Sequence, residues 1–333
     1  MSRITQFGNR LYTGETSVNF IGRKWLWYAV SSAAILVAVG FTVLRGGFSF
    51  GIEFRGGSEF QILGAEQVTT EIAVETITSE IGADAQVRAT IVGGSTVRVQ
   101  TDQLTTEETD ALRDQLAGAY GVGRDDVTSS FIGASWGSDI TVQALRALAI
   151  FIVLVSVVMA LYFRTWKMSV AAITAMIHDL VITAAVYGAF GLEVTPAAII
   201  GLLTILGYSL YDTVVVFDKI RENTSIPYDV SKRTFADSVN LAVNQTLVRS
   251  INTSVVGVLP VGSILFIGSI LLGAGTLRDI SLALFIGIVA GAYSTMFIAA
   301  PLYAQLREGE AEESKQGRLI DEKIVRNDSG AVR

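Results

Sequence analysis

The sequence contains no cysteine and a single histidine among its 333 residues. A domain outside the cytosol must therefore fold without disulfides, and thiol chemistry and cysteine-ligated metals are excluded. One histidine also excludes a multi-histidine metal site. Charged residues are only 17% of the chain, and the net charge of -6 comes without a long basic stripe, which argues against nucleic-acid binding. We expect neither a metal nor an organic cofactor.

Long apolar runs are what the sequence has in abundance. Half of the residues are hydrophobic and the mean hydropathy is +0.49, too high for a soluble domain of this length. A bilayer core needs roughly 20 apolar residues per helix. The first run lacks a small-x-small cleavage site and is longer than the apolar region of a signal peptide, so it predicts a retained helix. The six runs cover 25–44 and about 143–163, 169–190, 196–217, 246–270 and 279–303.

The distribution of positive charge indicates the orientation of these helices. Lysines and arginines gather in 163–167 and 219–233, whereas the other short loops carry one at most. The positive-inside rule then places both termini in the cytoplasm. We expect a cytoplasmic segment 1–24, a transmembrane helix 25–44, an extracytoplasmic domain 45–140, five helices within 141–303 and a disordered cytoplasmic tail 304–333.

The extracytoplasmic segment has the pattern of an α+β domain. Its periodicity predicts the ferredoxin-like order β-α-β-β-α-β. A capping box, Thr105 to Glu108, opens the second predicted helix. The predicted strands lie at about 50–62, 86–92, 96–100 and 127–132, the first of them including Phe50 to Phe54, and the helices at 69–82 and 105–120.

One face of the fourth apolar run is polar. Thr204, Tyr208 and Asp212 recur at steps of four, which places them on the same side of a helix. An ionisable residue inside a membrane helix is costly and is a functional hypothesis by default. The alternative is a solvated aspartate near the cytoplasmic end. The apolar run 214–217 that follows Asp212 favours the functional interpretation.

The fifth run offers Asp212 a partner. Arg249 and Thr253 are one helical turn apart, just inside the cytoplasmic end of this run. If the fourth and fifth helices are antiparallel neighbours, Asp212 and Arg249 lie at a similar depth in the membrane. The proton affinity of a buried carboxylate depends on whether a guanidinium lies beside it, so movement of Arg249 would switch that affinity. The alternative is that Arg249 only extends its charge to the membrane surface.

His178 and Asp179 lie near the middle of the third run. Together with Tyr208 they suit a proton relay, and equally well hydrogen-bonded packing. In the sixth run, Gly287 and Gly291 have the spacing of a close helix-packing motif.

Several signatures resemble those of the SecD/SecF family, in the order and spacing of its SecF branch. They are FGIEFRGG at Phe50–Gly57, the pair His178-Asp179, GYSLYDTVVVFDKIREN at Gly207–Asn223 and NQTLVRS at Asn244–Ser250. The first supplies the family glycines and acid at the start of the outer domain, Gly51, Glu53, Gly56 and Gly57. Here Glu53 and Arg55 replace an aspartate and a small polar residue, while Tyr211 and Lys219 replace an asparagine and an arginine.

The resemblance implies half of an RND-superfamily unit, six helices completed by SecD. It implies a non-enzymatic subunit that assists SecYEG in moving unfolded preproteins with the proton motive force, among membrane lipids and with SecA and YajC as further partners. It assigns proton coupling to Asp212, Arg249 and Thr253, with sodium as the alternative ion.

Three other classes compete with this interpretation. An RND-type exporter of lipids or small molecules usually carries twelve helices in one chain, so this chain would be a half-subunit. An intramembrane aspartyl protease would use Asp179 and Asp212, but the Gly-x-Gly-Asp motif of that class is absent because Tyr211 precedes Asp212. A scaffold subunit would leave Asp212 and Arg249 inside the membrane without a role, at a cost of several kcal/mol unless they are paired.

Overall fold

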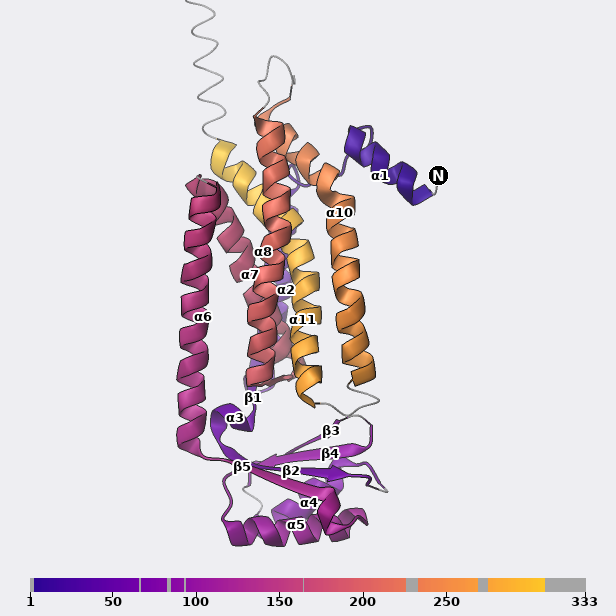
Figure 1. Ribbon diagram of the computed structural model, residues 1–333, viewed down its shortest axis with the longest axis vertical. Helices are drawn as coiled ribbons and strands as arrows, with labels where there is room; N and C mark the ends of the chain where they lie inside the picture. The colour runs from indigo at the N-terminus through magenta and orange to yellow at the C-terminus, as the bar shows by residue number, and fades with distance from the viewer. Residues whose placement is uncertain are drawn as a thin grey trace, which may run out of the picture.

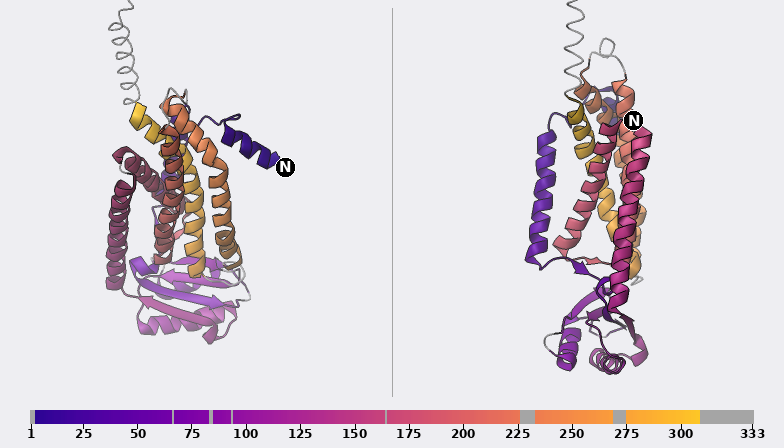
Figure 2. Two further views of the ribbon diagram at one scale, coloured as in Figure 1. Left: turned by 45° about the horizontal axis from the view of Figure 1, so that its top comes forward. Right: turned by 90° about the vertical axis from the view of Figure 1, so that its left-hand side faces the viewer.

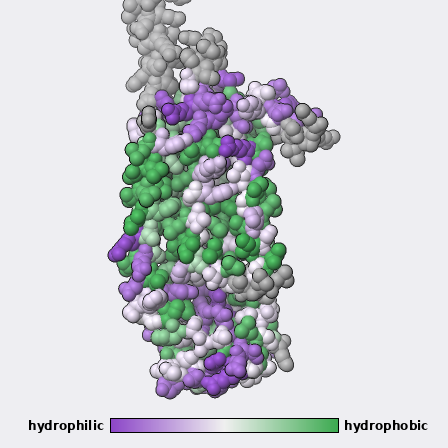
Figure 3. Space-filling model, viewed as in Figure 1, coloured by the Kyte–Doolittle hydropathy of each residue, from purple (hydrophilic) through white to green (hydrophobic). Residues whose placement is uncertain are grey.

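A computed structural model of the chain describes residues 3–65, 67–82, 85–92, 94–163, 165–225, 233–268 and 275–308. Six of its helices are long and apolar enough to cross a membrane, as predicted. They stand side by side along the long axis of the molecule, with an α+β domain at one end (Figure 1). Their apolar surfaces form a band between two hydrophilic ends (Figure 3). The helices are α2 (Lys24–Leu44), α6 (Ala134–Phe163), α7 (Trp166–Phe190), α8 (Pro196–Thr224), α10 (Phe235–Ser263) and α11 (Gly275–Ser294).

Four of these helices extend well beyond the predicted apolar runs. Helix α6 begins at Ala134 rather than near 143, which also corrects the predicted end of the outer domain at 140. Helix α8 continues to Thr224, and α10 begins at Phe235. At the start of α10 the Thr234 hydroxyl accepts a hydrogen bond from the Asp237 amide at 3.1 Å, and the Asp237 carboxylate accepts one from the Thr234 amide at 3.2 Å. This capping box starts the helix in a polar segment that hydropathy does not mark. Beyond α11, a π-helical turn, η3 (Thr295–Ala299), leads into helix that reaches residue 308.

The continuation of helix to residue 308 corrects the predicted start of a disordered tail at 304. Tyr303 and Ala304 are buried there, so the first part of that segment belongs to the helix bundle. The rest of the predicted tail, 309–333, lies outside the described residues.

The outer domain has the predicted ferredoxin-like topology. In chain order it consists of β2 (Gly57–Leu63), α4 (Thr70–Ile81), β3 (Arg88–Val92), β4 (Thr96–Thr101), α5 (Thr106–Tyr120) and β5 (Val127–Ile132). The strands form an antiparallel sheet in the order β3-β4-β2-β5, and both helices cover the same face of it (Figure 1). Between them lies a separate apolar core of Phe60, Ile62, Val97, Val99, Ala73, Ile77, Leu112 and Leu116. Each larger side chain in it contributes roughly 1.5–3 kcal/mol by burial.

The predicted capping box of α5 is present. The Thr105 hydroxyl accepts a hydrogen bond from the Glu108 amide at 3.2 Å, and the Glu108 carboxylate accepts one from the Thr105 amide at 2.8 Å. These bonds to Thr105 lower the pKa of the Glu108 carboxyl, because they favour its charged form.

The start of the outer domain differs from the prediction. Strand β1 covers only Ser49–Phe50, and Ile52–Arg55 form a helical turn, α3, instead of continuing the strand. Gly56 and Gly57 end this turn with φ of 74° and 139°, angles that other residues rarely adopt. A Cβ at Gly57 would lie 2.5 Å from the carbonyl oxygen of Thr101. The glycine pair therefore turns the chain sharply into β2.

Two further elements were not predicted. Strand β1 pairs in parallel with β6 (Glu193–Val194), which lies in the loop between α7 and α8. A helix, α1 (Arg3–Thr13), lies at the end of the bundle away from the outer domain (Figures 1 and 2). Leu11 of this helix is buried, and Gly8 lies close to Val248 of α10. The segment 1–24 is therefore partly folded onto the bundle.

The interior of the bundle is built around α7, α8 and α11, whereas α2 and α6 lie at its periphery (Figures 1 and 2). Helix α11 packs closely against α8 through the predicted pair of glycines. A Cβ at Gly287 would meet the Ile205 side chain at 2.5 Å, and one at Gly291 would meet Ser209 at 2.9 Å. Small residues thus let these helices approach, as expected for membrane helices.

Candidate ion-coupling site

Asp212 lies on α8 inside the helix bundle and is only 6% exposed. Its Oδ1 accepts a hydrogen bond of 3.0 Å from the Ser250 hydroxyl of α10. Its Oδ2 is buried and has no hydrogen-bond partner among the described residues. A buried carboxylate in apolar surroundings is costly unless it is paired or binds a proton. One oxygen of Asp212 is therefore hydrogen-bonded and the other has no partner in the described residues, so a cation or proton at the second oxygen would be stabilised.

Arg249 precedes Ser250 on α10 but does not pair directly with Asp212. Its side chain is exposed on the outside of the bundle, and its charge acts on the Asp212 carboxylate through space, without a hydrogen bond. Successive helical residues are rotated by about 100° around the axis, so only one of two neighbours can face α8. Ser250 takes that position. The role of Arg249 as the partner of Asp212 stays a prediction.

Tyr208 and Thr253 join α8 to α10 close to the same level. The Tyr208 hydroxyl donates a hydrogen bond of 2.6 Å to the main-chain carbonyl of Thr253. The Thr253 hydroxyl donates to the carbonyl of Arg249 at 2.9 Å and is not bonded to Asp212. Tyr208, Thr253 and three neighbours, Asn252, Val256 and Gly257, line a shallow cavity of about 360 Å³ on this face. The predicted residues Asp212, Tyr208, Arg249 and Thr253 thus lie on two adjacent helices.

His178 and Asp179 form a second polar centre in the bundle. Asp179 is 1% exposed, and its Oδ2 accepts a hydrogen bond of 2.5 Å from the Ser209 hydroxyl. The His178 ring lies 3.4 Å from Asp179 Oδ1, and its other nitrogen contacts the Ser31 hydroxyl of α2. The ring also stacks on Tyr293 of α11. His178 and Asp179, which lie on α7, therefore contact the three helices α2, α8 and α11.

Among the described residues, the link between the two polar centres runs through α8. Ser209 and Asp212 are three residues apart on that helix. Thr213 of the same helix continues the polar line to η3, where its hydroxyl lies 2.9 Å from that of Thr295. No hydrogen bond joins Asp179 to Asp212 in the part of the chain that the structure describes. A proton moving between them would need an intermediate carrier.

Three serines were missed by the sequence reasoning: Ser31, Ser209 and Ser250. Ser209 precedes Asp212 by one helical turn, a spacing that was available as a signal. Ser250 directly follows a predicted site residue, but only the rotation of α10 shows that it faces Asp212. Nothing in the local pattern around Ser31 distinguishes it from other small polar residues of membrane helices.

The family residues at the start of the outer domain lie at the opposite end of α8 from Asp212. Gly51, Gly56 and Gly57 shape the turn before β2, and Glu53 lies on α3 with its Oε2 buried and without a hydrogen-bond partner in the described residues. Burial raises the pKa of the Glu53 carboxyl, and the nearby Glu193 and Glu59 add to this. A backbone hydrogen bond and Arg98 oppose the shift in pKa. This group therefore belongs to a junction between the domains rather than to the intramembrane site.

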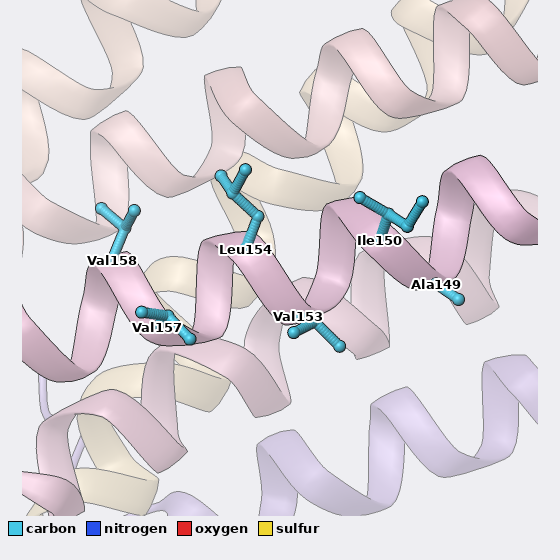
Figure 4. Close-up of a pocket in the computed structure, with 6 residues that line it drawn as sticks. All are labelled: Ala149, Ile150, Val153, Leu154, Val157 and Val158. Atoms are coloured by element: carbon cyan, nitrogen blue, oxygen red, sulfur yellow. The ribbon is translucent and has the colours of Figure 1, made fainter.

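The described part of the chain offers no candidate metal centre. Its described ranges hold no group of three or more histidine, aspartate and glutamate residues placed to bind a metal. A shallow hollow of about 510 Å³ on α6 is lined only by Ala149, Ile150, Val153, Leu154, Val157 and Val158. Their side chains point to two sides of the helix (Figure 4). This surface is suited to lipid or another apolar helix, not to ion chemistry.

These features define a class: a polytopic α-helical membrane protein with buried carboxylates in its bundle and a ferredoxin-like domain outside it. The C-terminal model of the SecD/SecF protein export membrane proteins matches residues 115–309. The chain belongs to the SecD/SecF family. The four sequence signatures that resemble SecF lie at the start of the outer domain around α3, in α7, in α8 and in α10.

Curated members of the family match most of the chain. The protein translocase subunit SecF of Mycobacterium tuberculosis H37Rv is 44% identical, with 91% of this chain and 70% of that protein covered. The subunit SecF of Streptomyces coelicolor is 42% identical, with 94% of this chain and 83% of that protein covered. SecDF of Thermus thermophilus is 31% identical over 85% of this chain but only 38% of that protein.

The fold is also found in solved structures. A crystal structure of SecDF from Thermus thermophilus, described as a translocon-associated membrane protein, matches with a TM-score of 0.76 and 31% identity, covering 88% of this chain and 39% of that one. A structure of SecDF in a super-membrane-facing form matches with a TM-score of 0.59 and 28% identity, covering 90% of this chain and 40% of that one. The chain thus spans about two-fifths of these SecDF chains.

Proposed function

We propose that this chain is the SecF-type subunit of a protein export complex in the bacterial plasma membrane, with both termini in the cytoplasm. In this role it assists SecYEG-dependent movement of unfolded preproteins and uses the proton motive force without being an enzyme. The observation that carries the proposal is Asp212, a buried carboxylate with one hydrogen bond from Ser250 and a second oxygen left unpartnered in the described residues. Such a group binds and releases a cation at a low structural cost.

The proposed partner is SecD. The support is that the matching Thermus thermophilus protein is a SecDF chain of which this chain covers only 38%. The face formed by α8 and α10 gives a physical reason, because polar side chains there are exposed within the membrane-spanning segments. Arg249, Asn252 and Tyr211 all belong to this face. Polar groups facing lipid are costly, so a second helix bundle that covers them would stabilise the assembly.

The proposed coupling ion is the proton, with sodium as the alternative. Asp212 would hold the ion, Arg249 would supply the opposing charge and Thr253 would orient α10. His178, Asp179 and Tyr208 would act as a relay. The close contact of Ser209 with Asp179 supports this relay, since Ser209 lies one turn from Asp212 on the same helix.

The test of the coupling role is export into proteoliposomes that contain the channel, SecA, SecD and this chain. Asp212→Asn is expected to insert and to pair with SecD but to abolish stimulation by the proton gradient. Arg249→Met is expected to reduce it in the same way, whereas Arg249→Lys retains part of it because the charge remains. Normal stimulation with Asp212→Asn would remove the coupling assignment.

Co-purification from native membranes separates this proposal from an exporter of lipids or small molecules. Recovery of SecD together with the channel is expected. Recovery of a SecD-like half without any channel component, at low detergent and in repeated preparations, would favour the exporter.

A further inference from the structure

The loop between α7 and α8 makes the contacts that join α8 to the outer domain. The chain itself connects the two regions only through α2 and α6, the peripheral helices, and neither carries Asp212. Helix α8 has no covalent link to the domain. The three residues before α8, Glu193–Thr195, connect it to the domain through non-covalent contacts. They are called the junction segment here.

Each residue of the junction segment binds a different element. The Glu193 carboxylate accepts a hydrogen bond of 2.6 Å from the Gln100 amide on β4 and lies 3.7 Å from the Arg98 guanidinium. The Val194 carbonyl accepts one of 3.0 Å from the Gly51 amide. The junction segment therefore holds both the sheet and the start of the outer domain.

Thr195 connects the same segment to two membrane helices. Its hydroxyl caps α8 by accepting a hydrogen bond of 3.2 Å from the Ala198 amide. It also donates one of 3.0 Å to the Asp279 carboxylate at the start of α11. Thr195 is only 3% exposed, so these bonds are shielded from water and hold the first turn of α8 in place.

The side chains on the domain side are buried and mutually paired. Arg98 lies between Glu193 and Glu59, at 3.7 Å from each, and the Gln100 amide bridges the same two carboxylates. The three charged side chains are each no more than 16% exposed. Ion pairs so weakly solvated are sensitive to small displacements, because losing one partner leaves a buried charge.

We propose that the junction segment Glu193–Thr195 transmits movement of α8 to the outer domain, through Arg98 and Gln100 on its sheet. Asp212 lies about 25 Å along α8 from Thr195, at about 1.5 Å per residue. A helix is rigid over that length, so a tilt or shift of α8 on ion binding would reach Glu193. Glu193 and Thr195 are positioning residues in this scheme. The inference rests on the proposed ion coupling at Asp212.

The test is hydrogen–deuterium exchange on the full chain, co-assembled with its SecD partner in lipid nanodiscs. Asp212→Asn, which imitates the proton-bound carboxyl, is compared with the unmodified chain. We expect it to change the exchange rates of amides in 49–51 and 96–101 by about tenfold, since these opening equilibria depend on the junction. In a Glu193→Gln background the same substitution is expected to change them by less than about twofold.

Arg124→Met is the matched control background. Arg124 pairs with Asp110 and Asp114 on the exposed far side of the outer domain, so its loss should leave the response to Asp212→Asn intact. Unchanged exchange in β2 core amides shows that Glu193→Gln leaves the domain folded. An equal response with and without Glu193, or no response to Asp212→Asn in either background, overturns the inference. Normal gradient-driven export by Asp212→Asn would instead remove the proposed coupling role and leave the mechanical link standing.

Discussion

The Ser250 hydroxyl of α10 donates a hydrogen bond of 3.0 Å to the Asp212 carboxylate of α8, and both side chains are buried. This bond, rather than a direct contact with Arg249, is what holds the carboxylate against the neighbouring helix. It leaves Oδ2 without a partner in the described chain, and so open to a proton, an ion or a group from a partner subunit.

Ser250→Ala is expected to reduce gradient-dependent export by roughly tenfold, because an orphaned buried group costs about 1–3 kcal/mol. The measurement is the same proteoliposome assay, with and without a proton gradient. Ser254→Ala is the control, since that hydroxyl donates to the carbonyl of Ser250 in its own helix and has no bond to Asp212 among the described residues. Equal loss in both variants would mean that α10 is merely sensitive to alanine.

Asp179 is expected to contribute to the stability of the bundle as well as to any relay. Asp179→Ala should lower the free energy of unfolding by about 3 kcal/mol, because it removes a buried carboxylate that accepts from Ser209 and faces His178. Thermal unfolding in detergent measures this. Ser209→Ala should cost less, and the double variant should cost less than the sum, since the two residues share one hydrogen bond. Strict additivity would contradict this arrangement.

Gly57→Ala is expected to destabilise the outer domain by about 3 kcal/mol or more. The glycine has a φ of 139°, and the added Cβ would lie 2.5 Å from the Thr101 carbonyl oxygen. Gly64 is the matched control, because it also has a positive φ, 68°, but open space around its Cβ. Gly64→Ala should cost about 1 kcal/mol. Similar costs in the two variants, measured by thermal unfolding, would show that the close approach at Gly57 relaxes.

Glu53 is expected to make the outer domain less stable as the pH rises. Its pKa in the folded protein is raised above its ordinary value of 4.5, first by burial and then by Glu193 and Glu59. The protonated form is therefore the stabilising one, and its contribution is present below about pH 4.5 and lost as the pH rises through the raised pKa. Unfolding midpoints between pH 4 and 8 measure this.

Glu53→Gln imitates the protonated carboxyl and should flatten that pH dependence. Glu75→Gln, on the exposed side of α4, serves as the control and should leave it unchanged. If Glu53→Gln keeps the full pH dependence, another group of the junction is responsible for it.

Much of the architecture was predictable because it depends on local patterns. The six membrane helices follow from apolar length, and the order of the outer domain follows from hydrophobic period and a capping box. Asp212 was also predictable, since one carboxylate in an apolar helix stands out without any knowledge of its neighbours.

What only the tertiary structure decided is which side chains meet. Hydropathy does not specify the rotation of α10 about its axis, and that rotation sets Ser250, not Arg249, against Asp212. The pairing of β1 with β6 joins residues more than 140 positions apart, and a two-residue strand has too little pattern to predict it. The sequence by itself determined that this is a six-helix membrane protein of the SecD/SecF family with a carboxylate in its fourth span. Packing determined the partners of that carboxylate, because contacts between helices depend on register and rotation that no single segment encodes.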